Sequence, residues 1–95
     1  MTNEADVYNA LRYCRVVTNS DGSRMYFDND NLLHRDDGPA ALWADGTEIW
    51  YQHGLRHRVG GPAITWPNGS PSWYLFGVWY TPGNYCKQLE LYGLQ

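Results

Sequence analysis

The feature of this sequence that most restricts its fold is an internal repeat of 23 residues. Residues 34–56 and residues 57–79 align with ten identities in 23 positions. The shared residues read His-Arg-x-x-Gly-Pro-Ala, then a Trp shortly before Asp-Gly or Asn-Gly, then Trp-Tyr-x-x-Gly. A period of this length is typical of arrays of small structural units that bury their apolar surfaces against one another.

A less complete copy of the repeat precedes these two. Residues 21–23 correspond to residues 45–47, and residues 25–27 correspond to residues 49–51, at a spacing of 24. About two and a half units therefore lie between residues 13 and 80, and the ends of the chain do not repeat.

Each unit is expected to be a β-hairpin, because Asp-Gly and Asn-Gly are the preferred pairs in two-residue type I′ turns. Such turns would set an aromatic side chain opposite a small or β-branched one in every hairpin. The predicted pairs are Tyr26 with Val17, Trp50 with Ala41, and Trp73 with Ile64. The same register puts Trp43 and Trp50 on one face of the sheet, and Trp66 and Trp73 likewise.

The predicted fold is mainly β, a meander or solenoid of about three tandem hairpins with a period of about 23 residues. Gly38-Pro39 and Gly61-Pro62 start new strands, because proline donates no hydrogen bond. The chain is treated as one domain, residues 1–95, with residues 1–12 as an N-terminal cap, 13–80 as hairpins and 81–95 as a helical cap. Tyr85, Leu89 and Tyr92 have helical spacing, with Thr81 or Asn84 as the cap and Gly93 as the stop; residues 3–11 also fit a short helix.

Composition excludes several classes of protein. Aromatic residues make up 16% of the chain, too many for a disordered segment. No run of about 18 apolar residues is present, so no membrane partner is expected. The net charge is −3, and the seven Lys and Arg residues form no basic patch, which argues against nucleic-acid binding.

The acidic N-terminus predicts no signal peptide and a cytoplasmic location. In that reducing compartment Cys14 and Cys86 are expected to be buried apolar residues.

The three histidines, His34, His53 and His57, are candidate metal ligands together with Asp36 or Asp37. His34 and His57 lie one repeat apart, so a packing role is expected for them, and no metal or cofactor is predicted. Arg35 and Arg58 are expected to bond at the surface to Asp36, Asp37 or neighbouring carbonyl groups, or to form an edge for an acidic partner or a phosphate. No nucleophile–base pair or carboxylate dyad is apparent, so the protein is not predicted to be an enzyme.

The string His-Arg-x-x-Gly-Pro-Ala, Asp/Asn-Gly and Trp-Tyr-x-x-Gly in residues 34–77 resembles the short hairpin repeats related to MORN repeats. Proteins with such repeats are common in tailed bacteriophages and large viruses and occur in bacteria. The resemblance implies a scaffold or interaction surface without catalytic residues. It also implies a phage-encoded protein, which would then act in the cytoplasm of the host cell.

The predicted function is therefore binding to a host protein, such as inhibition of a bacterial enzyme or defence complex, through rigid aromatic side chains. A small-ligand or nucleotide sponge and a structural homo-oligomer remain alternatives, and a homodimer is left open. The predicted binding residues are Trp50, Trp73, Tyr51, Tyr74, His34, Arg35, His57 and Arg58.

Overall fold

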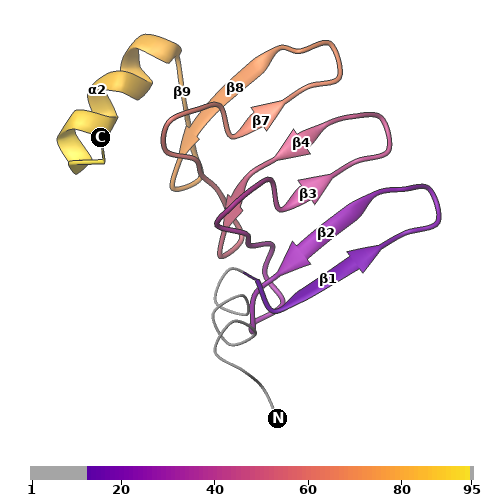
Figure 1. Cartoon of the computed structure of the whole chain (residues 1–95). Helices are drawn as coiled ribbons and strands as arrows, with labels where there is room; N and C mark the ends of the chain where they lie inside the picture. Colours follow the sequence, from indigo (N-terminus) through magenta and orange to yellow (C-terminus); the bar gives the residue numbers. More distant parts are fainter. Residues whose placement is uncertain (1–12, 95) are drawn as a thin grey trace.

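The computed structural model describes residues 13–94, which form short strands followed by a helix (Figure 1). The strands of this part are β1 (Arg15–Thr18), β2 (Arg24–Phe27), β3 (Ala41–Leu42), β4 (Glu48–Ile49), β5 (Tyr51–Gln52), β6 (Leu55–Arg56), β7 (Ile64–Thr65), β8 (Pro71–Leu75) and β9 (Val78–Tyr80). The helix is α2 (Pro82–Tyr92). A mainly β chain with a C-terminal helix is confirmed; the helix predicted at residues 3–11 lies outside the described residues.

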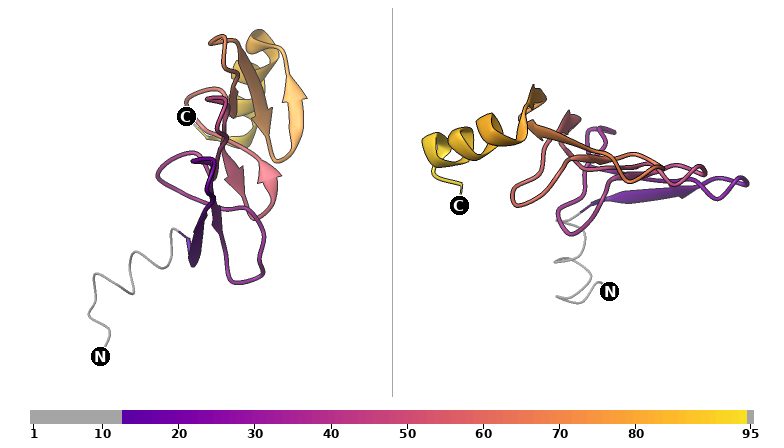
Figure 2. Two further views of the ribbon diagram at one scale, coloured as in Figure 1. Left: turned by 90° about the vertical axis from the view of Figure 1, so that its right-hand side faces the viewer. Right: turned by 90° about the horizontal axis from the view of Figure 1, so that it is seen from above.

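The strands pair only with antiparallel neighbours. Seven of them follow the order β1-β2-β3-β4-β7-β8-β9, and β5 pairs with β6 in a separate ribbon. The hairpins β1-β2, β3-β4 and β7-β8 point in the same direction, away from α2 (Figure 1). Seen from above, this part of the sheet is a single layer (Figure 2), and the shortest extent of the molecule is 19 Å against 47 and 32 Å.

The predicted register is wrong by one residue in all three hairpins. Val17 pairs with Met25, Ala41 pairs with Ile49, and Ile64 pairs with Ser72. The reason is the turn: each has three loop residues, closed by bonds such as Gly46 N–H to Trp43 O (3.0 Å) and Trp43 N–H to Thr47 O (2.9 Å). Only the glycine has a positive φ, +97° at Gly46, whereas a type I′ turn needs two such residues.

The residue after each Asp-Gly or Asn-Gly pair explains this turn. The Oδ1 atom of Asp45 accepts hydrogen bonds from Thr47 N–H (2.9 Å) and Thr47 Oγ1 (2.7 Å). Asp21 holds Ser23 in the same way. These hydrogen bonds hold the pKa of both carboxyl groups below the ordinary value, because they favour the charged form.

Type I′ geometry occurs instead at the opposite ends of the hairpins. His53-Gly54 joins β5 to β6, and Phe76-Gly77 joins β8 to β9, each as a two-residue loop. His53 (φ +46°) and Phe76 (φ +52°) have left-handed backbones, as do the glycines that follow them. Gly54 and Gly77, the last residues of the two Trp-Tyr-x-x-Gly strings, thus lie in tight reversals.

The corrected register also divides the tryptophans differently from the prediction. Alternation along the strands puts Trp43 on the same face as Ile49, while Trp50 points to the other face. The same reasoning separates Trp66 from Trp73, because the Trp66 indole bonds to Ser72 (3.0 Å), the neighbour of Trp73. The face with Trp43 and Trp66 is called the tryptophan face. Its two rows are Val17, Met25, Ala41, Ile49, Ile64 and Ser72, and Asn19, Ser23, Trp43, Thr47, Trp66 and Ser70.

Helix α2 follows the hairpins with the C-cap and one of the two N-caps that the sequence predicted, but of the predicted stripe Tyr92 is 51% exposed. Thr81 is the N-cap and accepts a hydrogen bond from Asn84 N–H (3.3 Å), and Gly93 is the C-cap with φ +71°. Tyr85 is the buried residue of the helix, 3% exposed.

The cysteine prediction is wrong, since Cys14 and Cys86 are both exposed thiols. Among the described residues, no helix is long and apolar enough to cross a bilayer.

Candidate functional site

The linkers between hairpins carry the predicted Arg residues, and each Arg covers a ring. The guanidinium of Arg35 lies 4.1 Å from the centre of the Tyr26 ring, and that of Arg58 lies 4.0 Å from Trp50. The Arg58 guanidinium also donates to Pro62 O (3.1 Å). These contacts make both arginines part of the packing between the linkers and the sheet.

The glycine three residues after each arginine makes this packing possible. A Cβ on Gly61 would lie 2.7 Å from Arg58 Cζ, and one on Gly38 would lie 2.8 Å from Arg35 Cζ. Any larger residue would therefore displace the guanidinium from its ring.

A tyrosine takes the place of the arginine at the third ring. Trp73 packs against Tyr85 of α2, with ring centroids 4.9 Å apart. The Tyr85 hydroxyl donates to Arg58 O and accepts a hydrogen bond from Gly60 N–H (3.0 Å). The Trp73 Nε1 atom is buried without a hydrogen-bond partner among the described residues. Helix α2 thus covers Trp73, the last of the three rings Tyr26, Trp50 and Trp73.

The linker histidines hold successive segments together. His34 Nδ1 accepts a hydrogen bond from His53 N–H (3.0 Å), and His57 Nδ1 accepts one from Phe76 N–H (2.9 Å). The rings also stack, His34 with His53 at 4.0 Å and His57 with Phe76 at 4.3 Å. Burial lowers the pKa of His57, which favours the neutral ring that accepts this bond. The structure gives both residues a packing role.

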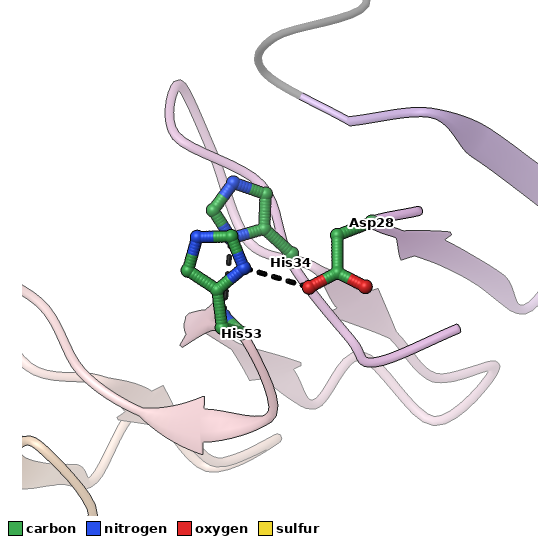
Figure 3. A group of neighbouring side chains, drawn as sticks. All are labelled: Asp28, His34 and His53. Atoms are coloured by element: carbon green, nitrogen blue, oxygen red, sulfur yellow. Dashed lines mark hydrogen bonds and ion pairs between the residues drawn. The ribbon is translucent and has the colours of Figure 1, made fainter. Parts of the chain in front are cut away.

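His34 and His53 lie beside Asp28, which sequence reasoning missed (Figure 3). Asp28 Oδ2 is 2.7 Å from His53 Nδ1, and Oδ1 accepts hydrogen bonds from the backbone of Asp30 (2.8 Å) and Leu32 (3.0 Å). A cavity of about 250 Å³ lies alongside. One sequence feature could have pointed to Asp28. The incomplete first copy of the repeat is one residue longer than the others, and the extra residue falls within residues 28–31.

This donor set fits a metal ion poorly in its present geometry. A metal lies in the plane of each imidazole that binds it, along the nitrogen lone pair. The rings of His34 and His53 are stacked 4.0 Å apart at an interplanar angle of 25°, so their planes meet far beyond the roughly 2.1 Å of a metal–nitrogen bond and one ion cannot bind both rings in plane. Phe76, which binds no metal, makes the matching stack on His57. The third histidine considered as a ligand, His57, is not part of the cluster.

Three of the predicted binding residues, Trp50, His57 and Arg58, line a second cavity of about 400 Å³. This cavity is called here the inter-hairpin pocket. It is lined by Trp50, Gln52, His53, Leu55, His57, Arg58, Val59 and Phe76. Leu55, Val59 and Phe76 are 46–49% exposed although they are large and apolar. A pocket of this size with exposed apolar walls is the type of surface that receives a ligand or a partner's side chain.

The other predicted residues are spread along the sheet. His34 is 4% exposed, and Trp73 lies under α2. Tyr51 and Tyr74 are half-buried, and the guanidinium of Arg56 lies 4.7 Å from the Tyr74 ring. Comparisons with family models, curated proteins and solved structures find no match for this chain.

Proposed function

We propose that this chain is a non-catalytic binding protein that acts by protein–protein interaction. Its scaffold would be an array of about three hairpin units of about 23 residues, closed by α2. The observation that supports the proposal is the inter-hairpin pocket with its three exposed apolar side chains, Leu55, Val59 and Phe76.

The walls of this pocket suit recognition because contacts already hold them in place. Arg58 is fixed between Trp50 and the carbonyl oxygen of Pro62, and His57 is bonded to the backbone of Phe76. A partner's apolar side chain that enters such a pocket loses water without forcing the protein to reorganise, which is how a few residues come to dominate the affinity of an interface.

The class of partner is proposed from the resemblance to MORN-related repeats of tailed bacteriophages. The chain would be phage-encoded and would cover a site on a bacterial host enzyme or defence complex in the host cytoplasm. The inhibition would be steric, because it would need only a rigid surface and no chemistry. The net charge of −3 does not favour a nucleic-acid target.

Affinity capture from a bacterial lysate, followed by titration of the purified partner, tests the proposal. We expect one stoichiometric partner that binds the wild type and is lost when Leu55→Ser and Val59→Ser are combined. Leu91→Ser is the matched control, because Leu91 is 77% exposed on α2 and does not line the pocket. Binding that survives the double substitution, or the absence of any stoichiometric partner, would contradict the proposal.

A small-molecule ligand is the second candidate, because about 400 Å³ falls within the usual size of ligand pockets. The Trp50 indole forms part of the wall, so its fluorescence reports on occupancy. A saturable change on titration with nucleotides, in the absence of any protein partner, would favour the sponge over the inhibitor.

A further inference from the structure

The two linkers that carry the His-Arg pairs hold their arginines in the same way. Each guanidinium lies 4.0–4.1 Å from the centre of a ring of the preceding hairpin. In each linker the Nη1 atom also donates to the carbonyl oxygen of the proline four residues later, at 3.3 Å for Arg35 and 3.1 Å for Arg58. The two linkers can therefore be compared donor by donor.

In the first linker, two carboxylates of the chain itself take up the donors that remain. Arg35 Nε donates to Asp37 Oδ1 (3.0 Å), and His34 Nε2 lies 3.5 Å from Asp36 Oδ1. Because His34 Nδ1 accepts a backbone hydrogen bond, the proton of the neutral ring is on Nε2, where it can be donated. A carboxylate is thus the group that fits these donors in this chain.

The second linker has the same donors without the carboxylates. The residues that correspond to the two aspartates are Val59 and Gly60. Among the residues that the structure describes, nothing accepts a hydrogen bond from Arg58 Nε or from His57 Nε2. Neither nitrogen is fully buried, so both are open to solvent. Arg58 and His57 line the inter-hairpin pocket, which therefore has two unused donors beside its apolar walls.

The charge of this part of the chain favours an acidic partner. Residues 49–89 contain no Asp or Glu, although the whole chain has a net charge of −3. The cations of this segment are Arg56, Arg58 and Lys87. All the residues that line the pocket belong to the same segment. Asp36 bonds to the amide of Gln52 in the pocket wall (2.8 Å) but does not itself line the pocket. A local excess of positive charge of this kind attracts an acidic surface.

We infer that the inter-hairpin pocket binds a peptide segment of a partner protein in which an acidic residue adjoins a large apolar one. The carboxylate would accept the hydrogen bond of Arg58 Nε, as Asp37 does in the first linker, and His57 Nε2 would donate to a further oxygen of the peptide. The apolar side chain would pack against Leu55 and Phe76. This partner chemistry rests on the binding function proposed above.

Side-chain ¹⁵N NMR of the full chain with two blocked peptides tests this chemistry. The probes are acetyl-Leu-Glu-Leu-amide and the same peptide with glutamine in place of glutamate. The glutamate peptide should shift the Arg58 Nε–H signal and bind at least about fivefold more tightly than the glutamine peptide. The Arg35 Nε–H signal is the internal control and should not move, because Asp37 already accepts its hydrogen bond.

A substitution in the second linker provides a further test. Val59→Asp returns a carboxylate to the position of Asp36 and should abolish the preference for the glutamate peptide. Val59→Asn is the matched control, since it has nearly the same shape without the charge and should retain the preference. Val59 is 46% exposed, so both variants should fold, which circular dichroism checks.

Three results would overturn the carboxylate recognition. They are equal affinity for the two peptides, binding of neither peptide, and a shift of the Arg58 signal by inorganic phosphate as large as that caused by the glutamate peptide. In the last case the donors would accept any anion. A lysate partner that requires Leu55 and Val59 would still support the proposed function in each of these cases, so the two failures can be distinguished.

Discussion

Replacing Gly61 with alanine tests whether the linker arginine must lie over this glycine to cover a ring. The new Cβ would lie 2.7 Å from Arg58 Cζ and 2.9 Å from its Nε, closer than non-bonded atoms approach. These atoms are at the end of a flexible side chain, so the guanidinium would move and the backbone would not. Its contacts with the Trp50 ring and Pro62 O would be lost.

The expected destabilisation follows from those two contacts. A partly desolvated cation–π contact contributes about 1–2 kcal/mol, and a hydrogen bond from a charged group about 1.5 kcal/mol. Alanine recovers about 0.4–1 kcal/mol by restricting the unfolded chain. The net loss should be about 1–3 kcal/mol, which lowers the Tm of a domain of this size by roughly 5–15 °C.

Thermal unfolding followed by circular dichroism measures the effect. Gly83→Ala is the matched control, because a Cβ there meets no atom within 4 Å, and its Tm should equal that of the wild type or rise by a few degrees as alanine restricts the unfolded chain. In an Arg58→Ala background, Gly61→Ala should no longer destabilise and should instead add the roughly 0.4–1 kcal/mol that alanine recovers, since the atoms that clash are gone. Fully additive effects of the two substitutions would refute the reasoning.

Three further predictions concern the histidine connector, the helix cap and the hairpin turn. Burial lowers the pKa of His57, so the folded chain binds fewer protons than the unfolded one. The unfolding free energy from urea titrations should therefore fall as the pH drops below about 6.5, and His57→Gln should weaken this dependence. Thr81→Ala removes the N-cap bond and should lower the unfolding free energy by about 1 kcal/mol, measured in the same titrations. Asp45→Ala should lower the Tm, whereas Asp45→Asn should retain most of it, because Asn68 makes the equivalent backbone bond to Ser70.

The sequence was sufficient to predict the kind of secondary structure and the end of the array. Proline, glycine and Asp-Gly or Asn-Gly pairs act locally, so the hairpins and the Gly93 stop could be placed from neighbouring residues, and the helix cap could be narrowed to Thr81 or Asn84. The strands β3, β4 and β7 are nevertheless only two residues long. The residue after β3 or β7 already bonds across the hairpin loop, Trp43 N–H to Thr47 O and Trp66 N–H to Ser70 O.

The register could not be predicted because Asp-Gly occurs in both two- and three-residue hairpin loops. The deciding signal was one position further on, the hydroxyl of Ser23 and Thr47, which bonds back to the aspartate. An error of one residue transfers every side chain to the other face. This is why the predicted pairing of Trp43 with Trp50 on one face was wrong.

The contacts of the linkers depended on tertiary packing that no local pattern reveals. The repeated Arg-x-x-Gly spacing was visible, but its reason, a guanidinium folded over a glycine onto a ring of the preceding hairpin, needed three dimensions. Asp28 was missed for a similar reason, since its partner His53 is 25 residues away in the sequence.

The division of Trp43 and Trp66 from Trp73 between the two faces of the hairpins can be measured directly by NMR. A soluble paramagnetic agent broadens the indole N–H signals of exposed tryptophans, which single Trp→Phe variants assign. We predict strong broadening for Trp43 and Trp66, which are 41% and 43% exposed, and protection of Trp73, whose Nε1 atom is buried under α2. If Trp73 were broadened as much as Trp43, the assignment of the faces would be contradicted.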